Sequence, residues 1–218
     1  MFFFQKYIIL LVQECKEKWN MKDSYTSLTL KMFLLIAAFQ FSFLIRAQES
    51  GKKDAIPVVL SEVDNLYKVS PDLYRSGQPS GHAVPELNDL GVKTILNLRN
   101  LSGNGRYKGT GVSEIVLKRK RINTWRIDRE DLLEAFRIFE KSPKPVLVHC
   151  KHGADRTGAF VAAYRIMYQS WSVEDAIDEL RNGGYGFHAK YFENIPELLR
   201  SVNFDLLRNE IKEQVKYD

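Results

Sequence analysis

One segment in the second half of the sequence constrains the fold more than any other. Residues 146–149 read Val-Leu-Val-His, which favours a buried strand, and Cys150 follows directly. Beyond a short loop, apolar residues recur with helical spacing between Phe160 and Met167. The segment therefore predicts a strand, a tight loop and the N-terminus of a helix. In such a loop the backbone amides turn inward, and together with the helix dipole they form an anion-binding site.

Cys150 and Arg156 lie at the two ends of this loop, with five residues between them. A cysteine inside an anion-binding loop is expected to be a thiolate at neutral pH and therefore a nucleophile. The planar guanidinium of Arg156 suits two oxygens of a phosphate, and the Thr157 hydroxyl is placed to donate to the sulfur as it leaves. The combination predicts phosphoryl transfer through a phosphocysteine intermediate. A buried cysteine at the end of a core strand is the alternative, and the Arg-Thr-Gly that opens the helix disfavours it.

Residues 149–158, His-Cys-Lys-His-Gly-Ala-Asp-Arg-Thr-Gly, resemble the signature of the cysteine-based protein tyrosine and dual-specificity phosphatases. Two upstream segments, 73–79 and 92–99, add to the likeness, which covers roughly residues 58 to 200. The likeness is greatest toward small bacterial dual-specificity-like phosphatases and the atypical plant and fungal group. It implies an α/β fold with a single central mixed, mostly parallel sheet flanked by helices, and it implies phosphatase activity.

The resemblance also assigns roles to the residues of the loop. Cys150 is expected to be the nucleophile and Arg156 the residue that holds the phosphate oxygens. His149 resembles the family's histidine before the cysteine, which orients the loop. The substrate-binding residues that we predict are His149, Lys151, His152, Gly153, Ala154 and Thr157.

The general acid is the point at which the sequence departs from the family. The position that aligns with the family's aspartate is Asn123, which cannot supply a proton. Asp128 is close by, but it also suits the N-cap of a helix. Asp155 lies in the loop itself, as in myotubularin-type phosphoinositide phosphatases, where the loop aspartate acts as an acid. Like charge from a bound phosphate would keep it protonated; alternatively, it faces away and pairs with a surface cation.

Charge and composition exclude several other classes of function. The net charge of the 218 residues is +5, but residues 1–47 hold six basic and three acidic residues, so the remainder carries only +2. No basic-aromatic array accompanies this charge, and we expect no nucleic-acid partner. No spacing of His, Cys or carboxylates suggests a metal site, and no cofactor is expected. We expect a monomer that acts on a phosphorylated protein or an inositol phosphate.

The N-terminal part of the sequence reads as a signal peptide over residues 1–47. Met32 to Ile45 is almost continuously apolar and follows Lys31, and Ala47 precedes a polar segment. We expect translation to start at Met21 or Met32, cleavage near Ala47, and export to the periplasm or the medium. An uncleaved membrane anchor is the alternative. Residues 48–57 read as a linker and 58–218 as the phosphatase-like domain, which then contains one cysteine and no disulfide.

Periodicity and turn residues place the other elements. Strands are predicted at 58–60, 66–69, 92–98 and 112–122. Helices are predicted at 84–90, after Asp128, after Ser172 and from 192 to 215. The basic run 118–121 is interpreted either as a solvated strand edge or as a rim that attracts polyanions.

Two other functions fit parts of the pattern. A phosphate-binding module without turnover would explain the missing upstream aspartate, but the intact Cys150 and Arg156 favour an enzyme. A rhodanese-like sulfurtransferase also uses a loop cysteine, and the Arg-Thr-Gly of the motif disfavours it. Phosphotyrosine proteins, phosphoinositides and soluble inositol polyphosphates all remain open as substrates.

Overall fold

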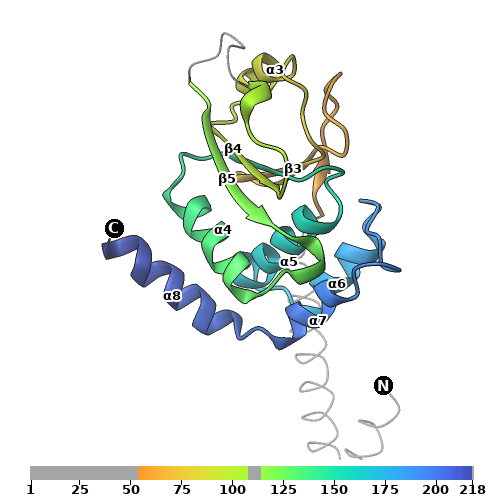
Figure 1. Ribbon diagram of the computed structural model, residues 1–218, viewed down its shortest axis with the longest axis vertical. Coiled ribbons are helices and arrows are strands. Elements are labelled where there is room, and N and C mark those ends of the chain that lie inside the picture. Colours follow the sequence, from red (N-terminus) through yellow and green to blue (C-terminus); the bar gives the residue numbers. More distant parts are fainter. Residues whose placement is uncertain (1–53, 108–113, 218) are drawn as a thin grey trace, which may run out of the picture. The chain divides into compact units, whose positions relative to one another are not determined.

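Six strands form one mixed sheet in the part of the chain that the computed structural model describes, residues 54–107 and 114–217 (Figure 1). They are β1 (Ile56–Pro57), β2 (Tyr67–Ser70), β3 (Leu73–Ser76), β4 (Thr94–Arg99), β5 (Val116–Ile122) and β6 (Val146–His149). The order across the sheet is β1-β2-β3-β6-β4-β5. The pairs β3–β6, β6–β4 and β4–β5 are parallel. The pairs β1–β2 and β2–β3 are antiparallel. The mixed, mostly parallel sheet is therefore confirmed.

β6 lies in the middle of the sheet, and all four of its residues are buried. A strand covered on both faces is expected to be continuously apolar, as its Val-Leu-Val is. In the parallel register, His149 lies beside Ser76 of β3 and Asn97 of β4. The carboxyl ends of β3, β6 and β4 therefore lie side by side next to Cys150. Open α/β sheets bind their ligands at this end of the strands.

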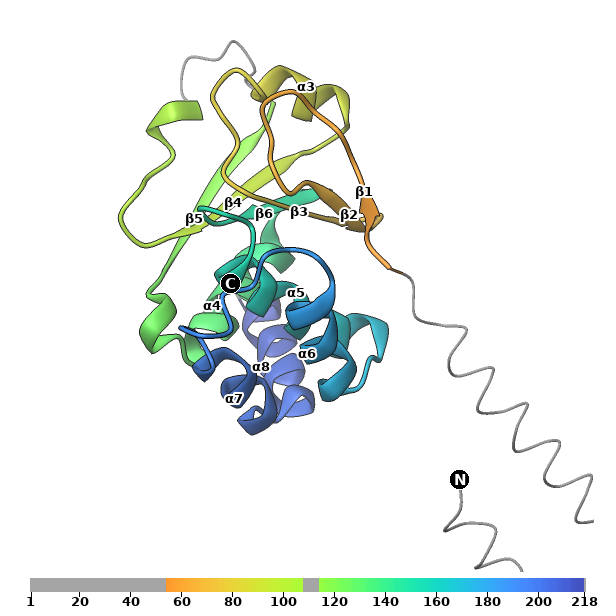
Figure 2. The same ribbon diagram turned by 90° about the vertical axis from the view of Figure 1, so that its right-hand side faces the viewer.

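Helices cover both faces of this sheet. They are α3 (Val84–Asp89), α4 (Arg129–Lys141), α5 (Asp155–Gln169), α6 (Val173–Asn182), α7 (Asn194–Ser201) and α8 (Phe204–Tyr217), with short 3-10 helices η1 (Gly105–Tyr107) and η2 (Thr124–Arg126). Figure 2 shows α3 on one side of the sheet and α4 to α8 on the other. Successive strand residues serve opposite faces: Ile95 packs in the cluster on the α3 side, and Leu96 in the cluster with α4 and α5.

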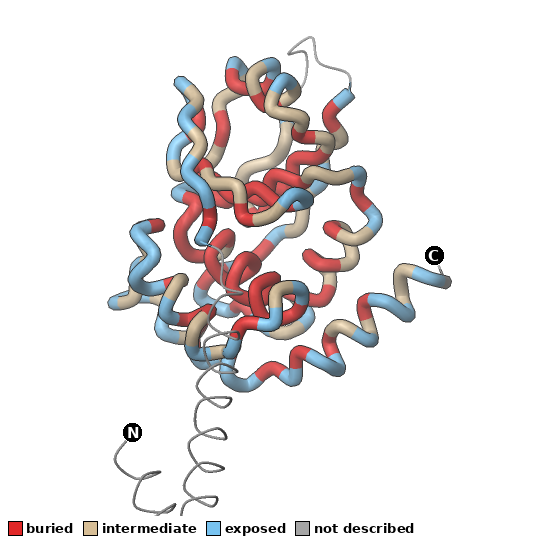
Figure 3. The backbone as a smooth tube through the Cα atoms, turned by 180° about the vertical axis from the view of Figure 1, so that it is seen from behind, coloured by how far each residue is buried: buried red, intermediate tan, exposed pale blue. Residues whose placement is uncertain are grey.

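α5 is the central helix of the larger layer. Twelve of its fifteen residues are buried, which is the pattern of a helix enclosed on nearly all sides. Figure 3 shows these buried positions continuing into the sheet, whereas the C-terminal helix alternates between buried and exposed positions. Because α5 starts at Asp155, its fixed N-terminus also fixes the end of the loop that follows β6.

Two predicted N-caps are confirmed. The Asp128 carboxylate accepts from the Asp131 amide at 2.9 Å, and the Ser172 hydroxyl accepts from the Asp175 amide at 3.1 Å. Each such cap stabilises its helix by about 1 kcal/mol.

The basic run 118–121 lies on β5, an edge strand, and part of it makes contacts within the domain. Lys120 pairs with Asp131 and Glu134 of α4. Arg119 donates to the carbonyls of Arg99 and Asn100. These contacts favour the interpretation of a strand edge over that of a free polyanion-binding rim.

Several boundaries differ from the sequence-based expectation, and the strand predicted over 112–122 begins at Val116. Residues 58–60 form no strand; β1 instead lies at Ile56–Pro57, within the predicted linker. Both β1 residues are exposed, so no apolar alternation marks the strand, and proline is compatible with such an edge. The helix predicted over 192–215 is two helices. Val202 is extended, and the Asn203 side chain accepts from the Leu206 amide and caps α8, a break that apolar periodicity does not record.

Residues 1–53 lie outside the described part, and the predicted signal peptide and start sites fall there. Among the helices of 54–107 and 114–217, none has the length and apolar character that a membrane crossing requires.

Candidate active site

The loop after β6 is held by its carbonyl groups. Four successive carbonyls accept hydrogen bonds from outside the loop: Cys150 O from His149 Nδ1 at 3.0 Å, Lys151 O from Gln78 N at 3.1 Å, His152 O from Asn65 Nδ2 at 2.9 Å, and Gly153 O from Arg75 Nη2 at 2.8 Å. A trans peptide directs its C=O and N–H to opposite sides. The amides of residues 151–154 therefore face the inner side of the loop, where an oxyanion can accept from them.

Gly153 allows the loop to lie directly on the end of β3. Its φ is +76°, and a Cβ there would stand 2.5 Å from Gly77 N and 2.6 Å from the Ser76 carbonyl carbon. The backbone of the loop and that of residues 76–77 cannot move apart to make room for a Cβ, so only glycine fits at this position. The glycine of the signature is thus required by the close approach of the loop to β3, and its predicted contribution to substrate binding is made by its backbone.

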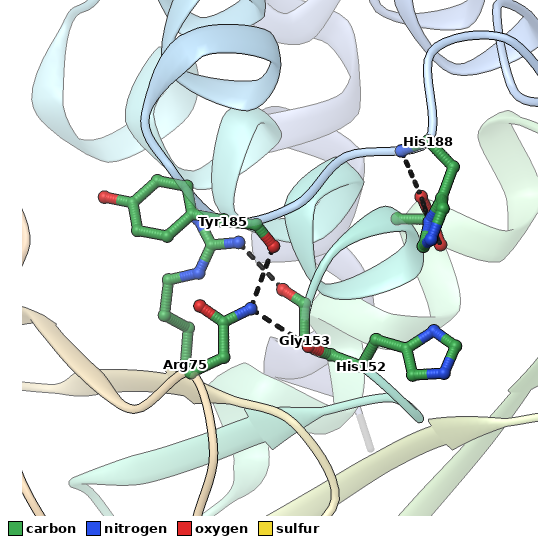
Figure 4. A network of polar contacts seen from close by, with 7 residues as sticks. Arg75, His152, Gly153, Tyr185 and His188 are labelled. Carbon is green, nitrogen blue, oxygen red and sulfur yellow. Dashed lines mark hydrogen bonds and ion pairs between the residues drawn. The ribbon is translucent and has the colours of Figure 1, made fainter.

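Arg75 supports the loop from within the protein (Figure 4). Its side chain is 1% exposed, donates to the Gly153 carbonyl, and lies 3.6 Å from the centre of the Tyr185 ring. Burial lowers the pKa of Arg75 to about 10, so the guanidinium remains charged at neutral pH. A hydrogen bond from a charged donor stabilises by about 1.5–3 kcal/mol. Arg75 therefore both anchors the loop and adds positive potential behind it.

Asn65 joins the loop to the segment between α6 and α7. Its side-chain nitrogen donates to the carbonyls of His152 and Tyr185, each at 2.9 Å. Asn65 itself has a φ of +56°, a conformation that asparagine tolerates better than most residues. One amide therefore sets the position of His152 relative to Tyr185 and the residues that follow it.

His149 is the last residue of β6 and lies inside the protein, directly before Cys150. It is fully buried; Nδ1 donates to the Cys150 carbonyl, and Nε2 lies 3.1 Å from the Tyr107 hydroxyl. Burial lowers the pKa of His149 to about 4 and raises that of Tyr107 to about 12, so a neutral ring accepts from an intact phenol. Both nitrogens have partners within the protein, which favours the orienting role of His149 over its predicted role in substrate binding.

Cys150 directly follows β6, and Arg156 and Thr157 lie in the first turn of α5. Cys150 is 1% exposed at the base of the loop. Within the described residues, the buried Nε of Arg156 and the buried hydroxyl of Thr157 have no hydrogen-bond partner. Buried polar groups without partners are rare and call for a ligand or a reacting group. Phosphate oxygens for Arg156, and the sulfur for Thr157, fit these two positions.

Two further arginines, Arg99 and Arg106, lie near Arg156. Burial and the neighbouring charges of Arg106 and Arg156 lower the pKa of Arg99. Arg99 also donates to the side chain of Gln78. The backbone amide of Gln78 is the one that donates to the Lys151 carbonyl of the loop. The guanidinium groups create a positive potential on the side of the site formed by the end of β4 and by η1.

The candidate acids occupy different surroundings. Asp155 is 6% exposed and accepts at Oδ1 from the backbone amide and the ring Nδ1 of His188, both at 3.0 Å. It thus has a partner on the segment between α6 and α7. Asp128 caps α4, and Asn123 caps η2 by accepting from the Trp125 amide.

The other residues predicted to bind substrate differ in exposure. Ala154 is buried, whereas Lys151 and His152 are exposed at the outer edge of the loop. Burial and the nearby charges of Lys151 and His188 lower the pKa of His152.

Sequence reasoning missed the roles of Asn65, Arg75 and His188. Arg75 lay within the segment 73–79 that carried the resemblance, so a signal for it existed. Asn65 and His188 had none, because each acts on a loop 33 to 87 residues away.

Comparisons with known proteins agree with this geometry. A family model described as the tyrosine phosphatase family matches residues 60–197. The dual specificity protein phosphatase TpbA of Pseudomonas aeruginosa is 34% identical over 161 residues, which cover 70% of this chain and 72% of that protein. Inositol diphosphatase DSP2 of Oryza sativa subsp. japonica is 28% identical over 59% of this chain and 66% of its own length.

Solved structures give the same result. The crystal structure of P. aeruginosa TpbA has 32% identity, a TM-score of 0.63, and coverage of 73% of this chain and 96% of that chain. The catalytic core of Siw14 from S. cerevisiae, at 22% identity and a TM-score of 0.60, covers 72% and 96% and shares the fold. The fold and the class of activity expected from the loop are confirmed. The chain belongs to the tyrosine phosphatase family and is a cysteine-dependent phosphatase.

Proposed function

We propose that the chain hydrolyses phosphotyrosine and related phosphate monoesters of proteins, with Cys150 as the nucleophile. The observation that carries this proposal is the set of four outward carbonyls, which directs the amides of residues 151–154 toward one oxyanion site above Cys150. A related structure supports the substrate class, because a variant of P. aeruginosa TpbA with serine in place of cysteine is described in complex with pTyr.

The reaction proceeds in two displacements. The Cys150 thiolate attacks phosphorus, an S–P bond forms, and the P–O bond to the alcohol or phenol breaks as an acid protonates the leaving oxygen. Arg156 and the loop amides bind the equatorial oxygens, whose charge they stabilise in the transition state. Water then attacks phosphorus, the S–P bond breaks, and inorganic phosphate leaves. The Thr157 hydroxyl donates a hydrogen bond to the departing sulfur.

A panel of substrates tests the proposal. We expect a phosphotyrosine peptide to give a higher kcat/KM than phosphoserine peptides, a phosphoinositide or an inositol pyrophosphate. The measurement is phosphate release from the full chain under one set of conditions. If the inositol pyrophosphate is the best substrate, the protein assignment is wrong and the second candidate replaces it.

That second candidate is hydrolysis of inositol phosphates or pyrophosphates. It is favoured by Arg99 and Arg106 beside Arg156, since a polyphosphorylated substrate needs more cations than one phosphate monoester does. Relatives in rice and Arabidopsis thaliana carry the name inositol diphosphatase. If this candidate is correct, Arg106→Gln lowers kcat/KM for the inositol substrate and leaves para-nitrophenyl phosphate unaffected.

We propose Asp155 as the general acid and Asp128 as its competitor. Asp155→Asn is expected to slow hydrolysis of substrates with poor leaving groups by about 100- to 10,000-fold. Para-nitrophenyl phosphate should be much less affected, because nitrophenolate leaves without a proton. The measurement is kcat for a series of aryl and alkyl phosphates with wild type, Asp155→Asn and Asp128→Asn.

The series separates three cases. If Asp128→Asn alone steepens the dependence on the leaving group, the segment before α4 supplies the acid and Asp155 does not. If neither variant changes the dependence, the substrate carries its own good leaving group, as a diphosphate would. That result would refute the choice of Asp155 and favour the inositol pyrophosphate candidate.

We also propose that the protein is exported as a monomer that begins near Gln48. The support is the apolar segment Met32 to Ile45 followed by Ala47. Mass spectrometry of the native protein should find a mature N-terminus close to Gln48 in the periplasm or the medium. An intact Met1 in a cytosolic fraction would contradict export, and size-exclusion chromatography tests the monomer.

A further inference from the structure

Three side chains with metal-binding atoms meet at the exposed edge of the phosphate-binding loop. His152 and Asp155 belong to the loop and the start of α5, and His188 comes from the segment between α6 and α7. Their ligand atoms all lie within 4.8 Å of one another. His188 Nδ1 is 3.0 and 3.1 Å from the two Asp155 oxygens, and the rings of His152 and His188 have centroids 5.6 Å apart (Figure 4).

We propose that His152, Asp155 and His188 form a binding site for a divalent transition-metal ion, with Zn²⁺ as the best match. Two imidazoles and one carboxylate form a donor set that suits Zn²⁺. Bonds of about 2.0–2.2 Å in a tetrahedron place donor atoms about 3.3–3.6 Å apart, close to the 3.0 and 3.1 Å between His188 Nδ1 and the two Asp155 oxygens. His152 is exposed, and its ring nitrogen lies within 4.8 Å of the other two ligand atoms, so a small adjustment of this side chain would complete the set of three. The fourth position takes water or a phosphate oxygen.

The protein holds the two segments of this site together without the ion. The Asn65 amide binds the carbonyl of His152 and that of Tyr185, which leads to His188. The His188 backbone amide donates to Asp155 Oδ1 at 3.0 Å, so the carboxylate keeps a supporting hydrogen bond when the ring nitrogen binds the metal. Such supporting contacts orient ligands and raise metal affinity. The cluster is therefore positioned by backbone contacts that do not depend on the metal.

Metal binding would act on the phosphatase directly. The ion would replace the hydrogen bond between the His188 ring and Asp155, the residue that we propose as the general acid. We expect Zn²⁺ to inhibit hydrolysis reversibly, an effect that rests on the proposed function. Zn²⁺ binding does not depend on the proposed function. Binding and inhibition are therefore measured separately, so that a failure of the metal site is distinguishable from a failure of the proposed function.

The experiment measures Zn²⁺ binding to the full chain in phosphate-free buffer by calorimetry, with Co²⁺ absorption as a spectroscopic readout of tetrahedral coordination. We expect one Zn²⁺ per chain in the wild type. His188→Ala and His152→Ala should each weaken binding by at least about 10- to 100-fold. His82→Ala is the matched control, because His82 is exposed on another segment and should leave affinity unchanged. Circular dichroism checks that each variant is folded.

Cys150→Ser distinguishes this site from simple capture of the metal by the nucleophile. We expect this variant to bind Zn²⁺ as the wild type does and to keep the tetrahedral Co²⁺ spectrum. Loss of binding in Cys150→Ser would overturn the proposal, because the thiolate would then be the ligand. Wild-type affinity in both His188→Ala and His152→Ala, or equal weakening in His82→Ala, would overturn it as well.

Discussion

Cys150→Ser is expected to abolish phosphatase activity while binding of inorganic phosphate survives. A serine hydroxyl does not ionise in this loop, so the attacking group is lost and turnover should fall by about 10⁵-fold or more. The four outward carbonyls and the cradle of amides do not involve the sulfur. Phosphate should bind at least as tightly, because the variant lacks the negative thiolate. Phosphate release assays and calorimetry measure the two effects.

His82→Ala serves as the control here as well, since His82 is exposed and lies on another segment. It should leave turnover unchanged. A Cys150→Ser protein that retains wild-type turnover would remove Cys150 as the nucleophile. Loss of phosphate binding with retained folding would instead show that the amide cradle alone cannot hold the anion.

Arg156→Lys is expected to lower kcat/KM by about 100- to 1,000-fold, although the charge is conserved. An ammonium group is a point charge and cannot donate in parallel to two phosphate oxygens as a guanidinium does. The Nε of Arg156 is buried without a protein partner among the described residues, so it is available for a phosphate oxygen, and lysine lacks this donor. Steady-state kinetics with para-nitrophenyl phosphate measure the loss without interference from leaving-group protonation.

Arg121→Lys on β5 serves as the control, because Arg121 is exposed at the strand edge and should tolerate the change. If Arg156→Lys shows nearly normal kinetics, Arg156 does not hold the transferring phosphoryl group in the way proposed. A large rise in KM with unchanged kcat would mean that Arg156 binds the ground state and the transition state equally well.

Local signals were sufficient to predict much of the domain. The apolar run of β6 marks a central strand, and the caps Asp128 and Ser172 follow from side chains that bind amides three residues away. The break between α7 and α8 was missed because an apolar face with helical spacing continues across it. The two-residue β1 was missed because both of its residues are exposed.

The sequence by itself determined the family and predicted the nucleophile and the phosphate-binding arginine, because these groups are contiguous in one strand–loop–helix segment. The tertiary structure decided how that segment is held and what stands beside it. Arg75 and Asn65 reach its carbonyls across 78 and 87 residues, and His188 reaches Asp155 across 33. Hydrogen bonds between such distant groups leave no period or spacing in a sequence. In the proposed metal site, His188 joins His152 and Asp155 only when the sheet and helices bring the two segments together.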